Sequence, residues 1–135
     1  MIFRAAVFAA LVLALGLTWA LVPMLASARA GRRVNRLRQP QISLGAPTVL
    51  FFSGEHCTVC HYQQKPAIEG LRAEHAGLRV VVVDAAREPL LSRRFGVLSL
   101  PTTAVLAPDG TVGAVNYGFA PAHRLAAQIS GLPGA

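Results

Sequence analysis

Two cysteines, Cys57 and Cys60, are the side chains of this 135-residue chain best suited to covalent chemistry. A cysteine thiolate is a strong nucleophile, and two cysteines separated by two residues can alternate between a dithiol and a disulfide. A small protein scaffolded by disulfides needs several spaced cysteine pairs, and a count of two excludes that class. The pair is therefore a redox pair, part of a metal site, or a haem attachment point.

The pair lies where a strand is expected to end and a helix to begin. Residues 48–52 are a short apolar, β-prone run, and the chain from Cys57 to about His75 has helical spacing of its apolar side chains. The positive end of a helix stabilises an anion, so this position favours the thiolate of Cys57. Cys60 follows one turn later on the same side. We predict that Cys57 attacks a substrate disulfide and that Cys60 resolves the mixed disulfide.

The rest of the domain alternates between strand and helix patterns. We predict a second buried strand at residues 78–83, a short helix at 89–95, a hairpin of strands at 102–106 and 111–117, and a final helix at 121–129. The order is β-α-β-α-β-β-α, with a right-handed parallel crossover first and an antiparallel pair last. The predicted fold class is α/β with a mixed four-stranded sheet.

Two segments resemble the signatures of the thioredoxin family. The sequence FFSGEHCTVC at residues 51–60 resembles the active-site segment, and FGVLSLPT at residues 95–102 resembles the segment in which a cis proline faces the CxxC. The separation of 44 residues between Cys57 and Pro101 matches the usual one, and Gly118 lies where thioredoxins carry a glycine. The resemblance covers about residues 47–129.

The resemblance implies a thioredoxin-like fold and a thiol–disulfide oxidoreductase that acts on protein substrates and exchanges electrons with a redox donor or acceptor. It implies that Pro101 is cis and that the backbone of Leu100 pairs with an extended substrate segment, so both are expected substrate-binding residues. We predict that the site needs no cofactor and no metal.

Several positions depart from the family pattern. Phe51 replaces the buried acid that assists proton transfer at the second cysteine, and Val80 replaces the lysine beside that acid. His56 replaces the tryptophan before the first cysteine, and Thr58-Val59 replaces the Gly-Pro pair between the cysteines. The helix proline, Pro66, lies one residue later than is common. Residues 29–46 are also too few for the usual first strand and helix, although residues 41–44 predict a short edge strand. This is a trimmed version of the family pattern.

Three polar side chains around the cysteines are candidates for proton transfer. His56 and His61 bracket the CxxC, where an imidazolium would favour the thiolate and a neutral imidazole could accept its proton. Glu55 could replace the missing buried acid. The alternative is that all three are exposed polar residues beside a turn. His75 and His123 are predicted to lie on helix surfaces.

Two other uses of the CxxC segment stay open at the sequence level. The string CTVCH at residues 57–61 also matches a c-type haem attachment motif, with His61 as an axial ligand. A zinc or adaptor module could use His56, Cys57, Cys60 and His61, but these ligands lie very close in sequence and a second separated pair is missing. Both alternatives are less consistent with the strand and helix order than a redox enzyme is.

The positive charge is concentrated in the N-terminal region. Residues 1–40 carry six Arg and no acid, whereas residues 41–135 carry seven basic and six acidic side chains, which together give the net charge of +7. A nucleic-acid-binding domain would carry basic residues over its folded surface. The predicted domain is nearly neutral, so nucleic acid is not an expected partner.

An apolar run at residues 5–28 is long enough to cross a bilayer, because 24 helical residues extend about 36 Å against a hydrocarbon core of about 30 Å. We predict a single transmembrane anchor, or an uncleaved signal-like segment, in contact with membrane lipid. A cleaved signal peptide is the alternative, since residues 26–28 and 28–30 resemble cleavage sites.

The Arg-rich segment at residues 29–38 follows this run, and only Arg4 precedes it. The excess of positive charge after the span favours a cytoplasmic location for the domain. The predicted division is a membrane anchor at 1–28, a basic juxtamembrane linker at 29–46 and a thioredoxin-like domain at 47–131.

Overall fold

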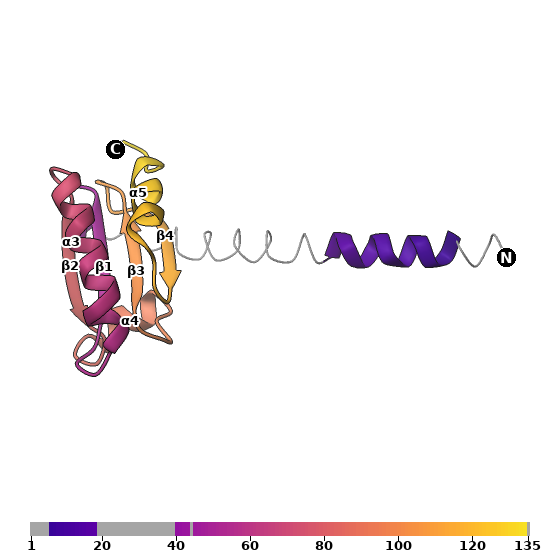
Figure 1. Ribbon diagram of the computed structural model, residues 1–135. Helices are drawn as coiled ribbons and strands as arrows, with labels where there is room; N and C mark the ends of the chain where they lie inside the picture. Colours follow the sequence, from indigo (N-terminus) through magenta and orange to yellow (C-terminus); the bar gives the residue numbers. More distant parts are fainter. Residues whose placement is uncertain (1–5, 19–39, 44, 135) are drawn as a thin grey trace. The chain divides into compact units, whose positions relative to one another are not determined.

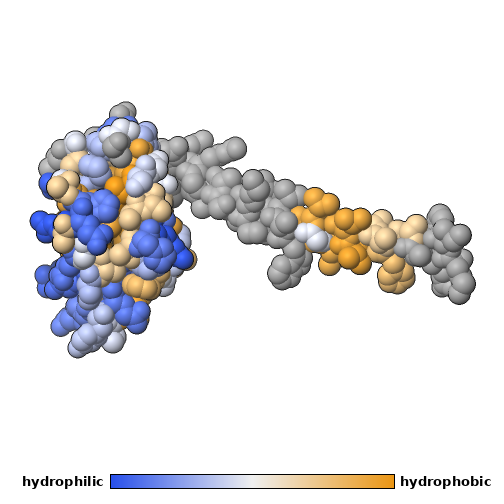
Figure 2. Space-filling view, turned by 45° about the horizontal axis from the view of Figure 1, so that its top comes forward, coloured by the Kyte–Doolittle hydropathy of each residue, from blue (hydrophilic) through white to orange (hydrophobic). Residues whose placement is uncertain are grey.

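The computed structural model describes residues 6–18, 40–43 and 45–134, which fall into two compact units, Met1–Arg33 and Val34–Ala135 (Figure 1). In the first unit, residues 6–18 form a helix whose side chains are exposed, and Figure 2 shows its apolar surface. Within the described part of the chain, no helix is both long and apolar enough to cross a membrane. The predicted anchor extends to residue 28, beyond the described helix, and the Arg-rich segment lies outside the described residues. Both therefore stay predictions.

The second unit is built on a mixed sheet with the strand order β2-β1-β3-β4. Its strands are β1 (Thr48–Ser53), β2 (Arg79–Asp84), β3 (Thr102–Leu106) and β4 (Val112–Tyr117). β1 pairs in parallel with β2 and antiparallel with β3, and β3 pairs antiparallel with β4. The predicted order of elements and both predicted strand orientations are confirmed.

Helices cover both faces of this sheet. Helices α3 (Lys65–Glu74) and α5 (Ala122–Ser130) lie across one face (Figure 1), while α2 (Pro40–Ser43) and α4 (Pro89–Arg94) contribute to the other. Alternate residues of each strand face opposite sides. The core under α3 and α5 contains Val49, Phe51, Ile68, Leu71, Val105, Leu125 and Ile129; the opposite core contains Leu50, Phe52, Val83, Phe95, Ala104 and Leu106.

The strand predicted as buried at residues 78–83 is an edge strand, so this prediction is wrong. β2 pairs with β1 along one side, and Val82 is 65% exposed. Four consecutive valines are typical of a strand buried on both faces, but here the apolar pattern reflects β propensity at an edge. The described part of the chain provides no further strand beside β2.

The edge strand predicted at residues 41–44 is also wrong, because Pro40–Ser43 forms the short helix α2 and residue 44 lies outside the described residues. Tertiary contacts explain the difference. Ile42 packs against the core beside α4, and the buried Ser43 hydroxyl donates a hydrogen bond to the carbonyl of Pro108 at 2.9 Å. These contacts outweigh the weak β propensity of four residues.

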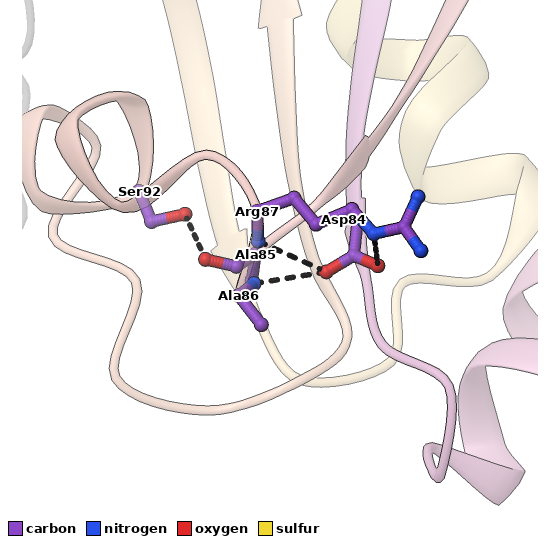
Figure 3. A network of polar contacts seen from close by, with 5 residues as sticks. All are labelled: Asp84, Ala85, Ala86, Arg87 and Ser92. Atoms are coloured by element: carbon purple, nitrogen blue, oxygen red, sulfur yellow. Dashed lines mark hydrogen bonds and ion pairs between the residues drawn. The ribbon is translucent and has the colours of Figure 1, made fainter.

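A carboxylate closes the turn that follows β2 (Figure 3). Oδ1 of Asp84 accepts hydrogen bonds from the backbone N–H groups of Ala86 at 2.9 Å and Arg87 at 3.3 Å. The hydroxyl of Ser92 in α4 donates to the carbonyl of Ala85 at 3.2 Å. These bonds fix the exit of β2 relative to α4 and thus the loop that leads toward the second family signature.

Candidate redox site

Cys57 and Cys60 form a disulfide at the N-terminus of the helical segment, with their Cα atoms 5.2 Å apart. Helical structure begins at Thr58, and the backbone N–H of Cys60 donates a hydrogen bond to the sulfur of Cys57 at 3.2 Å. An N–H group in the first helical turn therefore points at the first sulfur, as expected from the position of Cys57 at the start of the helix.

The two cysteines differ sharply in exposure. Cys57 is partly exposed, whereas Cys60 is 1% exposed and packs in the core with Phe51 and Ile68. Only the first sulfur is placed to meet a large substrate. This asymmetry supports Cys57 as the attacking thiol and Cys60 as the resolving one, although the roles stay predictions.

A π-helical turn, η1 (Cys60–Gln64), connects the cysteine pair to α3. A π turn contains more residues per turn than an α-helix, and it commonly accommodates a single extra residue at a functional site. Pro66 follows directly on the π turn, at the second residue of α3, within a helical segment that is continuous from Thr58. The π turn thus accounts for a helix proline one residue later than is common, and Pro66 produces no break inside α3.

Gln64 is a functional candidate that the sequence analysis missed. Its side chain is fully buried, donates to the carbonyl of Ala120 at 2.9 Å and accepts from the N–H of Ala120 at 2.9 Å. The helix that carries the cysteines is thereby joined to the segment between β4 and α5. A signal was present, because Gln64 shares its helical spacing with the apolar residues Cys60, Ile68 and Leu71.

The second signature reaches the same site. The Leu100–Pro101 peptide bond is cis, as the resemblance implies, and Pro101 is buried. The N–H of Gly118 donates to the carbonyl of Pro101 at 2.8 Å. A Cβ atom on Gly54 would lie 2.9 Å from Cδ1 of Leu100, so the loop before the cysteines lies directly against Leu100. The expected substrate-binding residues are thus beside the CxxC loop.

A pocket of about 330 Å³ opens beside the buried cysteine. Its walls come from β1, β2 and the helical segment: Phe51, Ser53, Cys60, His61, Lys65, Ile68, Glu69, Arg72, Val80 and Val82. Phe51 and Val80, the two positions where the family pattern has an acid and a lysine, therefore face the same space as Cys60. No titratable side chain from either strand lines this pocket.

The proton-transfer candidates are placed differently. His61 lines the pocket, and its Nε2 lies 3.2 Å from the carbonyl oxygen of Glu55. His56 and Glu55 are exposed near the cysteines. His75 caps the end of α3 through the carbonyl of Leu71 at 3.0 Å, and His123 is exposed on α5, so both lie on helix surfaces as predicted.

The alternative uses of CxxCH gain no support from the geometry. Haem attachment needs both sulfurs as thioethers, whereas the two sulfurs here are bonded to each other. Among the described residues, no group of three or more His, Cys, Asp and Glu side chains is arranged to hold a metal ion.

No known protein-family profile matches the chain. Similar solved structures include thioredoxin-2 of a malaria parasite, a component of protein secretion machinery, at 28% identity and a TM-score of 0.58, covering 63% of this chain and 82% of that one. Mitochondrial thioredoxin 3 of Saccharomyces cerevisiae matches at 23% identity and a TM-score of 0.59, covering 68% and 84%. Chloroplastic thioredoxin z matches at 22% identity and a TM-score of 0.57, covering 65% and 79%.

These likenesses and the disulfide at CxxC spacing agree with the resemblance found in the sequence. The chain has a thioredoxin-like fold and carries the redox pair at the position that the family signature indicates.

Proposed function

We propose that this thioredoxin-like chain is an oxidoreductase that exchanges disulfides with protein substrates through Cys57 and Cys60. At the level of the family, the fold and the CxxC disulfide support thiol–disulfide chemistry. The single observation that carries the proposal is the pairing of an accessible sulfur with a buried one at a helix N-terminus. That arrangement separates attack on a substrate from resolution of the product.

The reduced protein would act in two displacement steps. The thiolate of Cys57 attacks one sulfur of a substrate disulfide, which forms a mixed disulfide and releases the other substrate sulfur as a thiolate. The thiolate of Cys60 then attacks the sulfur of Cys57, which breaks the mixed disulfide and leaves the Cys57–Cys60 bond seen here. The substrate gains two electrons and the protein loses two, and an external donor restores the dithiol.

Three exposed apolar side chains on the segments around the site are the contacts that we propose for a protein substrate. Leu98, before the cis proline, is 96% exposed, Tyr62 in η1 is 79% exposed, and Phe119, after Gly118, is 40% exposed. Exposed large apolar side chains on neighbouring segments are typical of protein interaction surfaces. We propose that an extended substrate segment binds there and pairs with the backbone of Leu100.

Turnover of a protein disulfide tests this proposal. Reduction of insulin disulfides with dithiothreitol as donor should be accelerated by the wild type and not by the variant with both Cys57→Ser and Cys60→Ser. A matched control is Ser130→Ala in α5, a similar change of an exposed side chain far along the sequence from the cysteines. Equal turnover by the double variant and the wild type would contradict the oxidoreductase, and retention of partners by the double variant would indicate an adaptor.

We also propose that the protein is anchored in a membrane through residues 5–28, with the domain on the cytoplasmic side. The support is the apolar composition of this run and the five Arg residues that follow it. The compartment matters for the chemistry, because it decides whether the pair is maintained as a dithiol or as a disulfide.

A further inference from the structure

The buried cysteine needs a group that accepts its proton. Attack on the mixed disulfide requires the thiolate of Cys60, yet this residue is 1% exposed and packs against Phe51 and Ile68. Burial among apolar side chains disfavours the charged form of a thiol. The strand side of the pocket offers Phe51, Val80 and Val82, none of which can accept a proton, and the hydroxyl of Ser53 is a very weak base.

The pocket connects the buried cysteine with the helical rim. Cys60 and His61 both line it, and its volume of about 330 Å³ has room for several water molecules at roughly 30 Å³ each. Water can therefore carry a proton between two wall residues that are not in direct contact.

Besides Cys60 itself, four ionisable side chains line this pocket, and all come from η1 and α3: His61, Lys65, Glu69 and Arg72. An ammonium and a guanidinium have no acceptor site, which excludes Lys65 and Arg72. Oε1 of Glu69 lies 3.9 Å from Nζ of Lys65, and the side chain of Glu69 is 64% exposed. A carboxylate in water and paired with a cation is a weak proton acceptor, so His61 is the strongest candidate.

The ring of His61 is oriented by its backbone partner. A carbonyl oxygen only accepts hydrogen bonds, so Nε2 of His61, 3.2 Å from the oxygen of Glu55, carries the hydrogen. In the neutral ring, the lone pair then lies on Nδ1. His61 is exposed and lines the pocket, and the contact of Nε2 with the backbone carbonyl leaves Nδ1 as the proton-accepting nitrogen of the neutral ring.

We propose that His61 is the general base for the resolving step and that the pocket holds the water through which it acts. This inference rests on the proposed oxidoreductase function. In the mixed disulfide, Nδ1 of His61 gains the proton of the Cys60 thiol through pocket water. The new thiolate attacks the sulfur of Cys57, the bond to the substrate sulfur breaks, and the substrate leaves as a thiolate. The imidazolium returns its proton to bulk water.

A reaction that separates the two cysteine steps provides the test. Reduced protein mixed with 5,5′-dithiobis(2-nitrobenzoate) releases one coloured thiolate when Cys57 attacks and a second when Cys60 resolves. His61→Ala should leave the first release unchanged and slow the second by about 10²-fold, the usual contribution of a general base. His61→Gln, which can still donate to the carbonyl of Glu55, should be equally slow, because it restores the contact without the basic nitrogen.

Free imidazole tests the pocket itself. Added at constant pH and ionic strength, it should restore the second release in His61→Ala in proportion to its concentration. Val80→Phe, which fills the pocket, should abolish this rescue when combined with His61→Ala. His123→Ala on α5 is the matched control and should retain both rates.

The outcomes separate this inference from the proposed function. A normal first release with an unchanged second release in His61→Ala would overturn the role of His61, and slowing by His56→Ala or Glu69→Gln instead would assign the base elsewhere. If the reduced wild type releases no coloured thiolate in either step, the proposed oxidoreductase function is wrong. Rescue that persists with Val80→Phe would place the route outside the pocket.

Discussion

The difference in exposure between the two sulfurs organises the site at the scale of single residues. Cys57 is partly exposed, and its sulfur accepts a hydrogen bond from the backbone N–H of Cys60 at 3.2 Å, while Cys60 is 1% exposed. A helix N–H directed at a sulfur stabilises the thiolate when the disulfide opens. The accessible sulfur is therefore also the one that its surroundings activate.

Trapping of mixed disulfides follows from this asymmetry. Cys60→Ser should accumulate covalent complexes with substrate proteins, because the attacking thiolate of Cys57 remains and nothing resolves the product. Cys57→Ser should accumulate few, because its remaining thiol is 1% exposed. Non-reducing electrophoresis of cell extracts measures both. If the two variants trap equally, the assignment of attacking and resolving roles is wrong.

Phe51 is the position where a carboxylate should change the resolving step most directly. Phe51→Asp places an unpaired acid at a site that is 4% exposed, and we expect the free energy of unfolding to fall by about 3 kcal/mol or more. In the molecules that stay folded, a base beside Cys60 should raise turnover near neutral pH.

Insulin reduction over a pH series, with urea unfolding in parallel, measures both effects of Phe51→Asp. Phe51→Leu is the control for lost volume and should change stability without raising turnover. Combined with His61→Ala, Phe51→Asp should recover the second thiolate release. If Phe51→Asp raises the rate neither in the wild-type background nor in the His61→Ala background, proton transfer does not limit the reaction.

At the scale of secondary structure, the π turn and Gln64 connect the redox helix to the rest of the site. Gln64 forms two hydrogen bonds to Ala120, and Gly118, two residues earlier, donates to the carbonyl of the cis proline. The cysteine helix and the second signature are thus tied to one short segment.

Substitutions at Gln64 should separate hydrogen bonding from volume. Gln64→Leu leaves the N–H and carbonyl of the buried Ala120 without partners, and we expect a loss of about 2–4 kcal/mol in the free energy of unfolding. Gln64→Glu keeps both bonds only while the new carboxyl is protonated, since a protonated acid donates and accepts.

The pH dependence of Gln64→Glu follows from this requirement. Burial raises the pKa of the introduced carboxyl above its unfolded value of about 4.3, so the variant should be most stable relative to wild type below that pH. Its stability should then fall as the pH rises through the folded pKa, because the unfolded state ionises more readily. Urea unfolding midpoints at acidic and neutral pH measure this. A constant difference from wild type across pH would mean that position 64 is not a buried hydrogen-bonding site.

At the scale of the whole chain, charge and hydropathy divide the protein into unlike parts. Residues 1–40 carry six Arg and no acidic side chain, and this region includes the apolar run. The folded domain, in contrast, is nearly neutral. Such a composition is typical of a tethered domain. Among the described residues, β2 is an edge of the sheet, and its Val82 is exposed.

Fractionation tests the tether. We expect the full-length protein to stay with membranes after washing at high salt and at alkaline pH, because burial of an apolar span does not depend on charge. A variant that lacks residues 1–28 should be released. Mass spectrometry of the mature protein provides the control: an N-terminus near residue 29 or 31 would establish a cleaved signal and would contradict the anchor.

The sequence by itself predicted the cysteine pair and most of the fold. The CxxC spacing, its position between an apolar strand and a helix, and the signature around Pro101 identify the redox pair, the order of elements and the cis proline. The spacing of the cysteines and the order of elements are local features, since they depend on propensity and periodicity, whereas the cis proline is what the resemblance to the thioredoxin family implies.

Only the tertiary structure decided the surroundings of the pair. The exposure of β2, the helix at Pro40–Ser43, the partner of Gln64 and the shared pocket of Cys60 and His61 all depend on residues distant in sequence. A run of four valines is compatible with a buried strand and with an edge strand. The hydrogen-bond partner of Gln64 is defined only once the fold places Ala120 beside it. The physical reason is that burial and hydrogen-bond satisfaction belong to the packed chain, whereas periodicity belongs to the segment.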